Sequence, residues 1–164
     1  TRYEFDVIAR CCKQVALSPR TIKRLINVYK LFKIIWFRTK STQDEQEGKL
    51  VREAIISLLV VSARYPNLTR TIFEEIELKF DELKEEELKK ESLINFFPDN
   101  YSSCKDLYLK REWQKLIHDV TKIKLIPDIS LSELGQDTFN MIRSFCFIGD
   151  VGYDPSDFTK NNKI

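Results

Sequence analysis

The stretch Ser18-Pro19-Arg20-Thr21-Ile22-Lys23-Arg24-Leu25-Ile26-Asn27 combines a helix start, an apolar face and a group of cations. Serine is a preferred N-cap residue, and proline fits the first helical position because the N–H that it lacks has no partner there. The stretch therefore predicts a helix that begins at Pro19. Apolar residues recur at helical spacing from there onward, and they are Ile22, Leu25, Ile26, Tyr29, Phe32 and Trp36.

The opposite side of this helix is expected to carry its charged and polar residues. The candidate site residues are Arg20, Lys23, Arg24 and Asn27. One side of the helix would pack against a core, and the other would be available to an anion. The alternative is that these cations are ordinary solvated surface, as on the outer side of many amphipathic helices.

The segment Pro19–Asn27 has the form PR-x-x-KR-x-x-N. It resembles the element that follows the nucleotide-binding core in the KAP family of P-loop NTPases, where the chain passes into a helical C-terminal region. Two weaker similarities are the apolar helix around 53–64 with its Tyr65-Pro66 stop, and Arg143–Gly149, which resembles the closing RFSF-x-x-G pattern of the family. The resemblance implies a helical lid that contacts a nucleotide held by an upstream P-loop domain of the same chain.

The same resemblance implies roles for the four candidate residues. Arg20 would bind two phosphate oxygens and sense the γ-phosphate. Lys23 and Arg24 are the next candidates, and Asn27 would fix their geometry; the spacing does not decide which cation reaches the nucleotide. ATP and Mg²⁺ would be cofactors of the parent protein, an ATPase, and the family membership would suggest signalling or phage defence.

The glycines argue against a nucleotide-binding fold within this sequence. A Walker loop needs a glycine five residues before its Gly-Lys pair and a Ser or Thr after it, so that backbone N–H groups surround the phosphates. Gly48-Lys49 has Gln43 and Leu50 at those positions. We therefore expect no catalytic residues and no bound cofactor in this chain by itself, including at His118, the single histidine, for which no triad can be built.

The length of 164 residues, with 43% hydrophobic residues, fits one folded domain. The pattern predicts an all-α bundle of about six helices in residues 1–153 and a loose C-terminal tail at 154–164. A first helix would turn Phe5, Ile8, Cys12 and Val15 inward, and a helix at 49–65, apolar nearly all round, would lie at the centre. The other expected helices are 19–37, 68 to 88 or 94, 107–121 and 132–147, with loops at 41–48 and 99–106 and a short strand candidate at 124–126.

Several classes of protein are disfavoured by composition. The most apolar run, Ala54–Ala63, is shorter than the roughly 20 residues of a membrane span. The four cysteines lack C-x-x-C spacing, so no metal site is expected and reduced thiols are favoured, with Cys12 and Cys146 as small core residues. The start at Thr1 shows neither an initiator methionine nor a signal-peptide pattern, which favours a fragment of a larger cytoplasmic protein.

The charge is unevenly distributed although the whole chain carries only +2. Residues 1–40 hold ten Lys/Arg against two acids, a local charge of +8, whereas residues 74–91 hold nine acids against four lysines, a local charge of −5. The acidic helix near Glu74–Glu91 could dock a basic partner or could be a solvated face. Helical spacing there predicts the i,i+4 pairs Glu75–Lys79, Glu85–Lys89 and Glu86–Lys90.

Three functional hypotheses remain from the sequence. The first is the lid of a P-loop ATPase, which the resemblance favours. The second is a nucleic-acid module in which the +8 region binds phosphates and Tyr29, Trp36 and Phe37 stack on bases, although their spacing fits a core better. The third is a helical protein-interaction scaffold. Hydrolase chemistry within the chain itself is not expected, because its carboxylate pairs lie on a charged helix.

Overall fold

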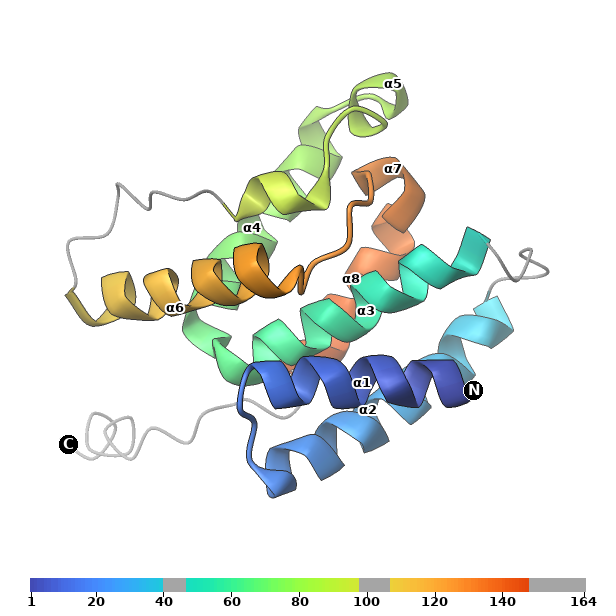
Figure 1. The fold of residues 1–164 in the computed structure, drawn as a ribbon. Helices are drawn as coiled ribbons and strands as arrows, with labels where there is room; N and C mark the ends of the chain where they lie inside the picture. The colour runs from blue at the N-terminus through green and yellow to red at the C-terminus, as the bar shows by residue number, and fades with distance from the viewer. Residues whose placement is uncertain (40–46, 98–106, 148–164) are drawn as a thin grey trace, which may run out of the picture.

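The computed structural model describes residues 1–39, 47–97 and 107–147 (Figure 1). Within these ranges the chain forms eight α-helices and one short 3-10 helix, without a β-strand, which confirms the all-α prediction. The expected loop at 99–106, the tail at 154–164 and Cys104 lie outside the described residues, as does most of the expected loop at 41–48. The elements are α1 (Arg2–Gln14), α2 (Pro19–Thr39), α3 (Glu47–Arg64), α4 (Pro66–Glu82), α5 (Glu85–Leu88), η1 (Leu93–Phe96), α6 (Leu107–Ile123), α7 (Leu131–Leu134) and α8 (Gln136–Phe147).

Helix α3 is the central element of the bundle. Every side chain from Ala54 to Val61 is buried, and α3 contacts α1, α2, α4, α7 and α8 (Figure 1). The expectation of a central helix is therefore confirmed, and its physical reason is that an apolar surface on all sides has to be covered on all sides. The helix begins at Glu47 rather than Lys49, so the loop predicted to extend through Gly48 ends earlier.

Helix α2 begins as its sequence predicts. The backbone N–H of Thr21 donates to the Ser18 hydroxyl at 3.2 Å, which is the N-cap contact, and Pro19 is the first helical residue. The predicted core side of this helix is confirmed, with two half-buried members, Ile22 and Ile26, and four buried ones, Leu25, Tyr29, Phe32 and Trp36.

Helix α1 is rotated slightly from the expected orientation. Phe5, predicted to face inward, has 49% of its surface exposed, whereas its neighbour Glu4 has 3% exposed. The buried side is set by Val7, Ile8, Cys11, Cys12 and Val15, and Glu4 rather than Phe5 lies one turn before Ile8 on that side. The carboxylate tolerates burial because the Lys33 ammonium of α2 donates to it at 2.6 Å.

The acidic segment is not one continuous helix, which corrects the prediction of a helix from 68 to 88 or 94. Helix α4 ends at Glu82, and Leu83 adopts an extended conformation before the short helix α5. Farther on, the backbone N–H of Leu93 donates to the Ile129 carbonyl at 2.8 Å. This hydrogen bond joins segments that are far apart in the sequence, so tertiary contacts here override helical spacing.

Much of the acidic run is used within the molecule. None of the three predicted i,i+4 pairs is within ion-pair distance among these described residues; the pair that forms is Lys89 with Glu86, at i,i+3 and 3.2 Å. Three acids instead bind side chains of the C-terminal helices: Glu77 with Arg143, Asp81 with Gln136, and Glu85 with Ser132. These contacts tie α4 and α5 to α7 and α8.

The expected C-terminal helix at 132–147 is divided into α7 and α8 by Gly135. Its φ of +79° is readily adopted by glycine and rarely by other residues, and it turns the chain between the two helices. The strand candidate at 124–126 is also wrong. Its Leu125 carbonyl accepts a hydrogen bond from the buried Ser57 hydroxyl of α3 at 2.6 Å, which fixes an irregular segment against the core.

Candidate functional site

The four predicted site residues lie together on the side of α2 that faces away from the core. Arg20, Lys23, Arg24 and Asn27 are all exposed. Among the described residues, none of these side chains forms a hydrogen bond or an ion pair. Their grouping, as the spacing predicted, leaves three cations and one amide available to a binding partner.

An apolar stretch continues the same side of α2 beyond Asn27. Leu31 and Ile34 are each 53% exposed, and Ile35 is 38% exposed. Steps of three and four residues lead from Arg24 through Asn27 to these positions, so the cations and the aliphatic side chains share one side of the helix. We call this surface the outer face of α2, and it consists of Arg20, Lys23, Arg24, Asn27, Leu31, Ile34, Ile35 and Arg38.

A groove of about 370 Å³ borders the outer face where α2 meets α3 and α8. Arg24 and Leu31 belong both to the outer face and to the lining of the groove. On the opposite wall, Phe145 packs edge-on against Phe32 with ring centroids 5.5 Å apart. Within the Arg143–Gly149 pattern, Arg143 pairs with Glu77 and Phe145 lines this groove, while Ile148 and Gly149 lie outside the described residues.

The aromatic residues considered for stacking on bases are mostly unavailable. Tyr29 is 6% exposed and Trp36 is 5% exposed, so both belong to the core, as their spacing suggested. Phe37 is 51% exposed, and its ring lies 5.5 Å from the Lys33 ammonium. A single exposed ring does not make a stacking platform for successive bases.

Cysteine and histidine contribute little chemistry to this surface. Burial, and then the neighbouring Cys11, raise the pKa of Cys12 to about 11, so its thiol stays protonated at neutral pH. Cys12 is buried and Cys146 is half-buried against the core, in agreement with the prediction that they are small packing residues. In the ranges that the structure covers, no three His, Cys, Asp or Glu side chains are grouped to hold a metal ion.

No helix in the described part of the chain is long and apolar enough to cross a membrane.

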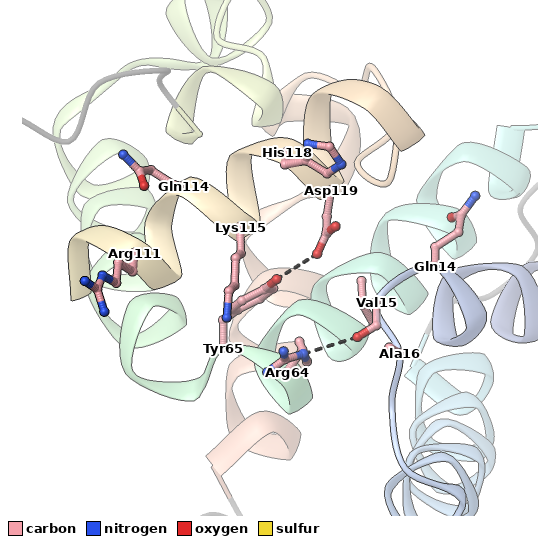
Figure 2. Close-up of a pocket in the computed structure, with 10 residues that line it drawn as sticks. All are labelled: Gln14, Val15, Ala16, Arg64, Tyr65, Arg111, Gln114, Lys115, His118 and Asp119. Atoms are coloured by element: carbon pink, nitrogen blue, oxygen red, sulfur yellow. Dashed lines mark hydrogen bonds between the residues drawn. The ribbon is translucent and has the colours of Figure 1, made fainter. Parts of the chain in front are cut away.

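A second group of cations, which sequence reasoning did not single out, surrounds a cavity of about 530 Å³ beside α6 (Figure 2). Arg111 and Lys115 come from α6, and Arg64 comes from the end of α3. We call this cavity the α6 cleft. The i,i+4 spacing of Arg111 and Lys115 indicates in the sequence that they share one side of a helix. The position of Arg64 beside them follows only from the tertiary fold.

No protein-family model, no curated protein and no solved structure matches this chain. The likeness to KAP proteins therefore rests on the residues quoted from the sequence, and a P-loop partner remains a prediction. What the molecule itself offers is the outer face of α2, which joins a cationic half, Arg20 to Asn27, to an apolar half, Leu31 to Ile35.

Proposed function

We propose that this chain is a helical interaction domain that docks onto another protein domain through the outer face of α2. The observation that carries the proposal is the exposure of Leu31, Ile34 and Ile35 in line with Arg20 and Arg24. Single exposed apolar residues are common on protein surfaces, whereas a group beside a row of cations is typical of a contact site. The complementary surface would be apolar with acidic groups at one end.

The magnitudes are sufficient for a specific contact. Complete burial of a fully exposed aliphatic side chain contributes about 1.5–3 kcal/mol. Leu31 and Ile34 are each 53% exposed and Ile35 is 38% exposed, so about half of that is available from each, or roughly 2–4 kcal/mol from the three. Exposed ion pairs contribute about 1 kcal/mol or less each, but they accelerate association and orient the partner. The apolar half would supply affinity, and the cationic half would supply orientation.

The partner that we propose is the upstream P-loop domain predicted from the resemblance, with ATP and Mg²⁺ bound to it. The helical chain would then act as a regulatory lid over the P-loop domain. An arginine from the cationic half of the outer face would contact the nucleotide phosphates. The exposed, unpaired positions of Arg20, Lys23 and Arg24 support this version of the proposal. Phosphates would complement the cationic half without any rearrangement of α2.

The first test is the coding sequence upstream of Thr1, which should contain Gly-x-x-x-x-Gly-Lys-Ser/Thr. The encoded P-loop region can then be labelled and titrated with this chain in the presence of ATP and Mg²⁺, with fluorescence anisotropy as the readout. Leu31→Glu and Ile34→Glu should each weaken the complex at least about tenfold, because each places a charge in an apolar contact. Leu78→Glu is the matched control, since Leu78 is 56% exposed on α4.

The lid version makes a separate demand on the cations. In the complete protein, Arg20→Ala or Arg24→Ala should lower ATP turnover about tenfold or more, because a cation aimed at the transferring phosphoryl group stabilises the transition state. Unchanged turnover, or an upstream sequence without the P-loop motif, would overturn the lid. Equal binding by the Leu31, Ile34 and Leu78 variants would overturn docking through α2. Self-association of this chain that Leu31→Glu abolishes would identify the partner as a second copy.

A further inference from the structure

The α6 cleft brings three positive side chains around one cavity. Figure 2 shows residues of α6 on one side of it, with Arg64 and the segment after α1 on the other. A neighbouring cavity of about 260 Å³ also has Arg64, Arg111 and Lys115 in its lining, so the three cations border both cavities. No described residue of α2 lines either cavity, which makes this site independent of the docking proposal.

The cations of the cleft, Arg64, Arg111 and Lys115, form no ion pair with any residue that the structure describes. Arg111 and Lys115 are exposed on α6, one turn apart, and Arg64 is half-buried. The linings of the two cavities hold these three cations against two carboxylates, Asp119 and Glu112, so positive charge is in excess there and an anion would be attracted.

Arg64 is held in place before any ligand arrives. Its Nε–H donates to the Val15 carbonyl at 3.2 Å, and its guanidinium carbon lies 5.1 Å from the centre of the Tyr65 ring (Figure 2). These two contacts leave the terminal amino groups of the guanidinium as donors, in a fixed fork that matches phosphate oxygens. Pre-organisation of this kind reduces the entropy lost on binding.

The carboxylates that line the cleft and its neighbouring cavity each accept a hydrogen bond from a tyrosine hydroxyl. The Tyr65 hydroxyl donates to an Asp119 carboxylate oxygen at 2.7 Å. Burial, and then this contact, raise the pKa of Tyr65, so its hydroxyl remains a donor and adds no second negative charge. In the smaller cavity, Glu112 accepts in the same way from the Tyr108 hydroxyl at 3.1 Å.

We propose that the α6 cleft binds a phosphate-bearing small molecule, with its phosphate held between Arg64, Arg111 and Lys115. The volume of the cleft, about 530 Å³, falls within the range of small-molecule sites. Lys115 and the fixed guanidinium of Arg64 lie near each other in Figure 2, and the exposed Arg111 side chain, which points away there, can turn toward a bound phosphate. The remaining space would accept the organic part of the molecule.

The test is isothermal titration of the full chain with inorganic phosphate, adenosine monophosphate and adenosine. Both phosphates should bind and adenosine should not, because the shared recognition element is the phosphate. Tighter binding of the nucleotide than of inorganic phosphate would identify a phosphorylated organic ligand, whereas equal binding would identify free phosphate as sufficient. Binding of adenosine as strong as that of its monophosphate would overturn the proposal.

Variants locate the site. Arg111→Ala and Lys115→Ala should each weaken phosphate binding about tenfold, since each removes a charged hydrogen-bond donor, and the double variant should lose it. Lys110→Ala is the matched control on α6, because Lys110 is exposed and lines neither cavity. Unchanged melting temperatures would verify folding. Wild-type binding by the double variant, or loss of binding in Arg24→Ala on α2, would overturn the assignment to this cleft.

Discussion

Glu4 shows how one residue can depart from the pattern of its helix. It is a buried carboxylate, and one of its oxygens accepts a hydrogen bond from the Lys33 ammonium at 2.6 Å. Burial by itself raises the pKa of a carboxyl group, but charged contacts, with Lys33 the foremost, outweigh it and hold the pKa of Glu4 below its ordinary value. Glu4 is thus ionised at neutral pH and links α1 to α2.

We predict that Lys33→Met lowers the free energy of unfolding by about 1–3 kcal/mol at neutral pH, because a buried carboxylate loses a charged donor. A folded-state pKa below the unfolded one gives stability that is present above the unfolded pKa and is lost as the pH falls through the folded pKa. The difference between variant and wild type should therefore shrink below about pH 4. Urea unfolding in neutral and acidic buffer measures both effects.

Lys30→Met is the matched control for that measurement. Lys30 is exposed on α2, and the same replacement there should change the free energy of unfolding by no more than about 0.5 kcal/mol. A similar loss in the Lys30 and Lys33 variants would show that the contact with Glu4 adds no stability.

At the scale of the element, the two faces of α2 have different roles: one face packs in the core, and the other is available for binding. Leu25 is 6% exposed, whereas its neighbour Arg24 is exposed. We predict that Leu25→Ala lowers the free energy of unfolding by about 2–5 kcal/mol, because it leaves a cavity in the core. Arg24→Ala and Arg20→Ala should each change it by about 0.5 kcal/mol or less. Thermal melting of the three variants compares the two faces, and arginine variants that melt as early as Leu25→Ala would make the cations structural.

The elements that the sequence could predict are those whose signals are local. For α2, the Ser18 cap and the apolar spacing from Ile22 to Trp36 are contained in one segment, and the same is true of the apolar helix α3. Where the prediction was wrong, distant partners decide the backbone. The backbone N–H of Leu93 donates a hydrogen bond to the Ile129 carbonyl, and no pattern in the neighbouring sequence predicts that contact.

The division of the predicted helix at 132–147 into α7 and α8 could have been predicted from neighbouring residues. Ser130 and Glu133 form a capping box at the start of α7, with the Glu133 N–H donating to the Ser130 hydroxyl at 3.2 Å. Because Gly135 follows the N-cap Ser130 by only five residues, the sequence indicates a short helix that ends at Gly135, where the chain changes direction. The α6 cleft was beyond such reasoning, because Arg64 and Lys115 are brought together by the packing of α3 and α6 regions far apart in the sequence.

At the scale of the whole molecule, the uneven charge does not by itself make a nucleic-acid-binding protein. The net charge is +2, and the acids of residues 74–91 balance much of the positive N-terminal region. Two of the three aromatic residues considered for stacking, Tyr29 and Trp36, are in the core. Phosphate contacts made by surface cations would then provide most of any affinity for nucleic acids.

We predict weak, non-specific retention of duplex DNA or RNA at low salt, which is lost near physiological salt. The logarithm of the binding constant should fall with the logarithm of salt concentration with a slope of about −0.9 for each phosphate neutralised. Fluorescence anisotropy with a labelled random duplex over a salt series measures this slope, and a duplex of reversed sequence is the control. Selective binding that persists at physiological salt would favour the nucleic-acid alternative over docking to a protein.

The return of α8 to α2 and α3 has a consequence for synthesis on the ribosome. Phe139 and Ile142 are completely buried, and Phe139 contacts the rings of Phe73 and Phe80 at centroid distances of 5.3 and 5.6 Å. A nascent chain that has released α1 to α4 therefore still has one side of its core open to water. Until Gln136–Phe147 emerges, that apolar side is accessible to chaperones and to other nascent chains, so folding of the bundle can be completed only after this helix has been synthesised.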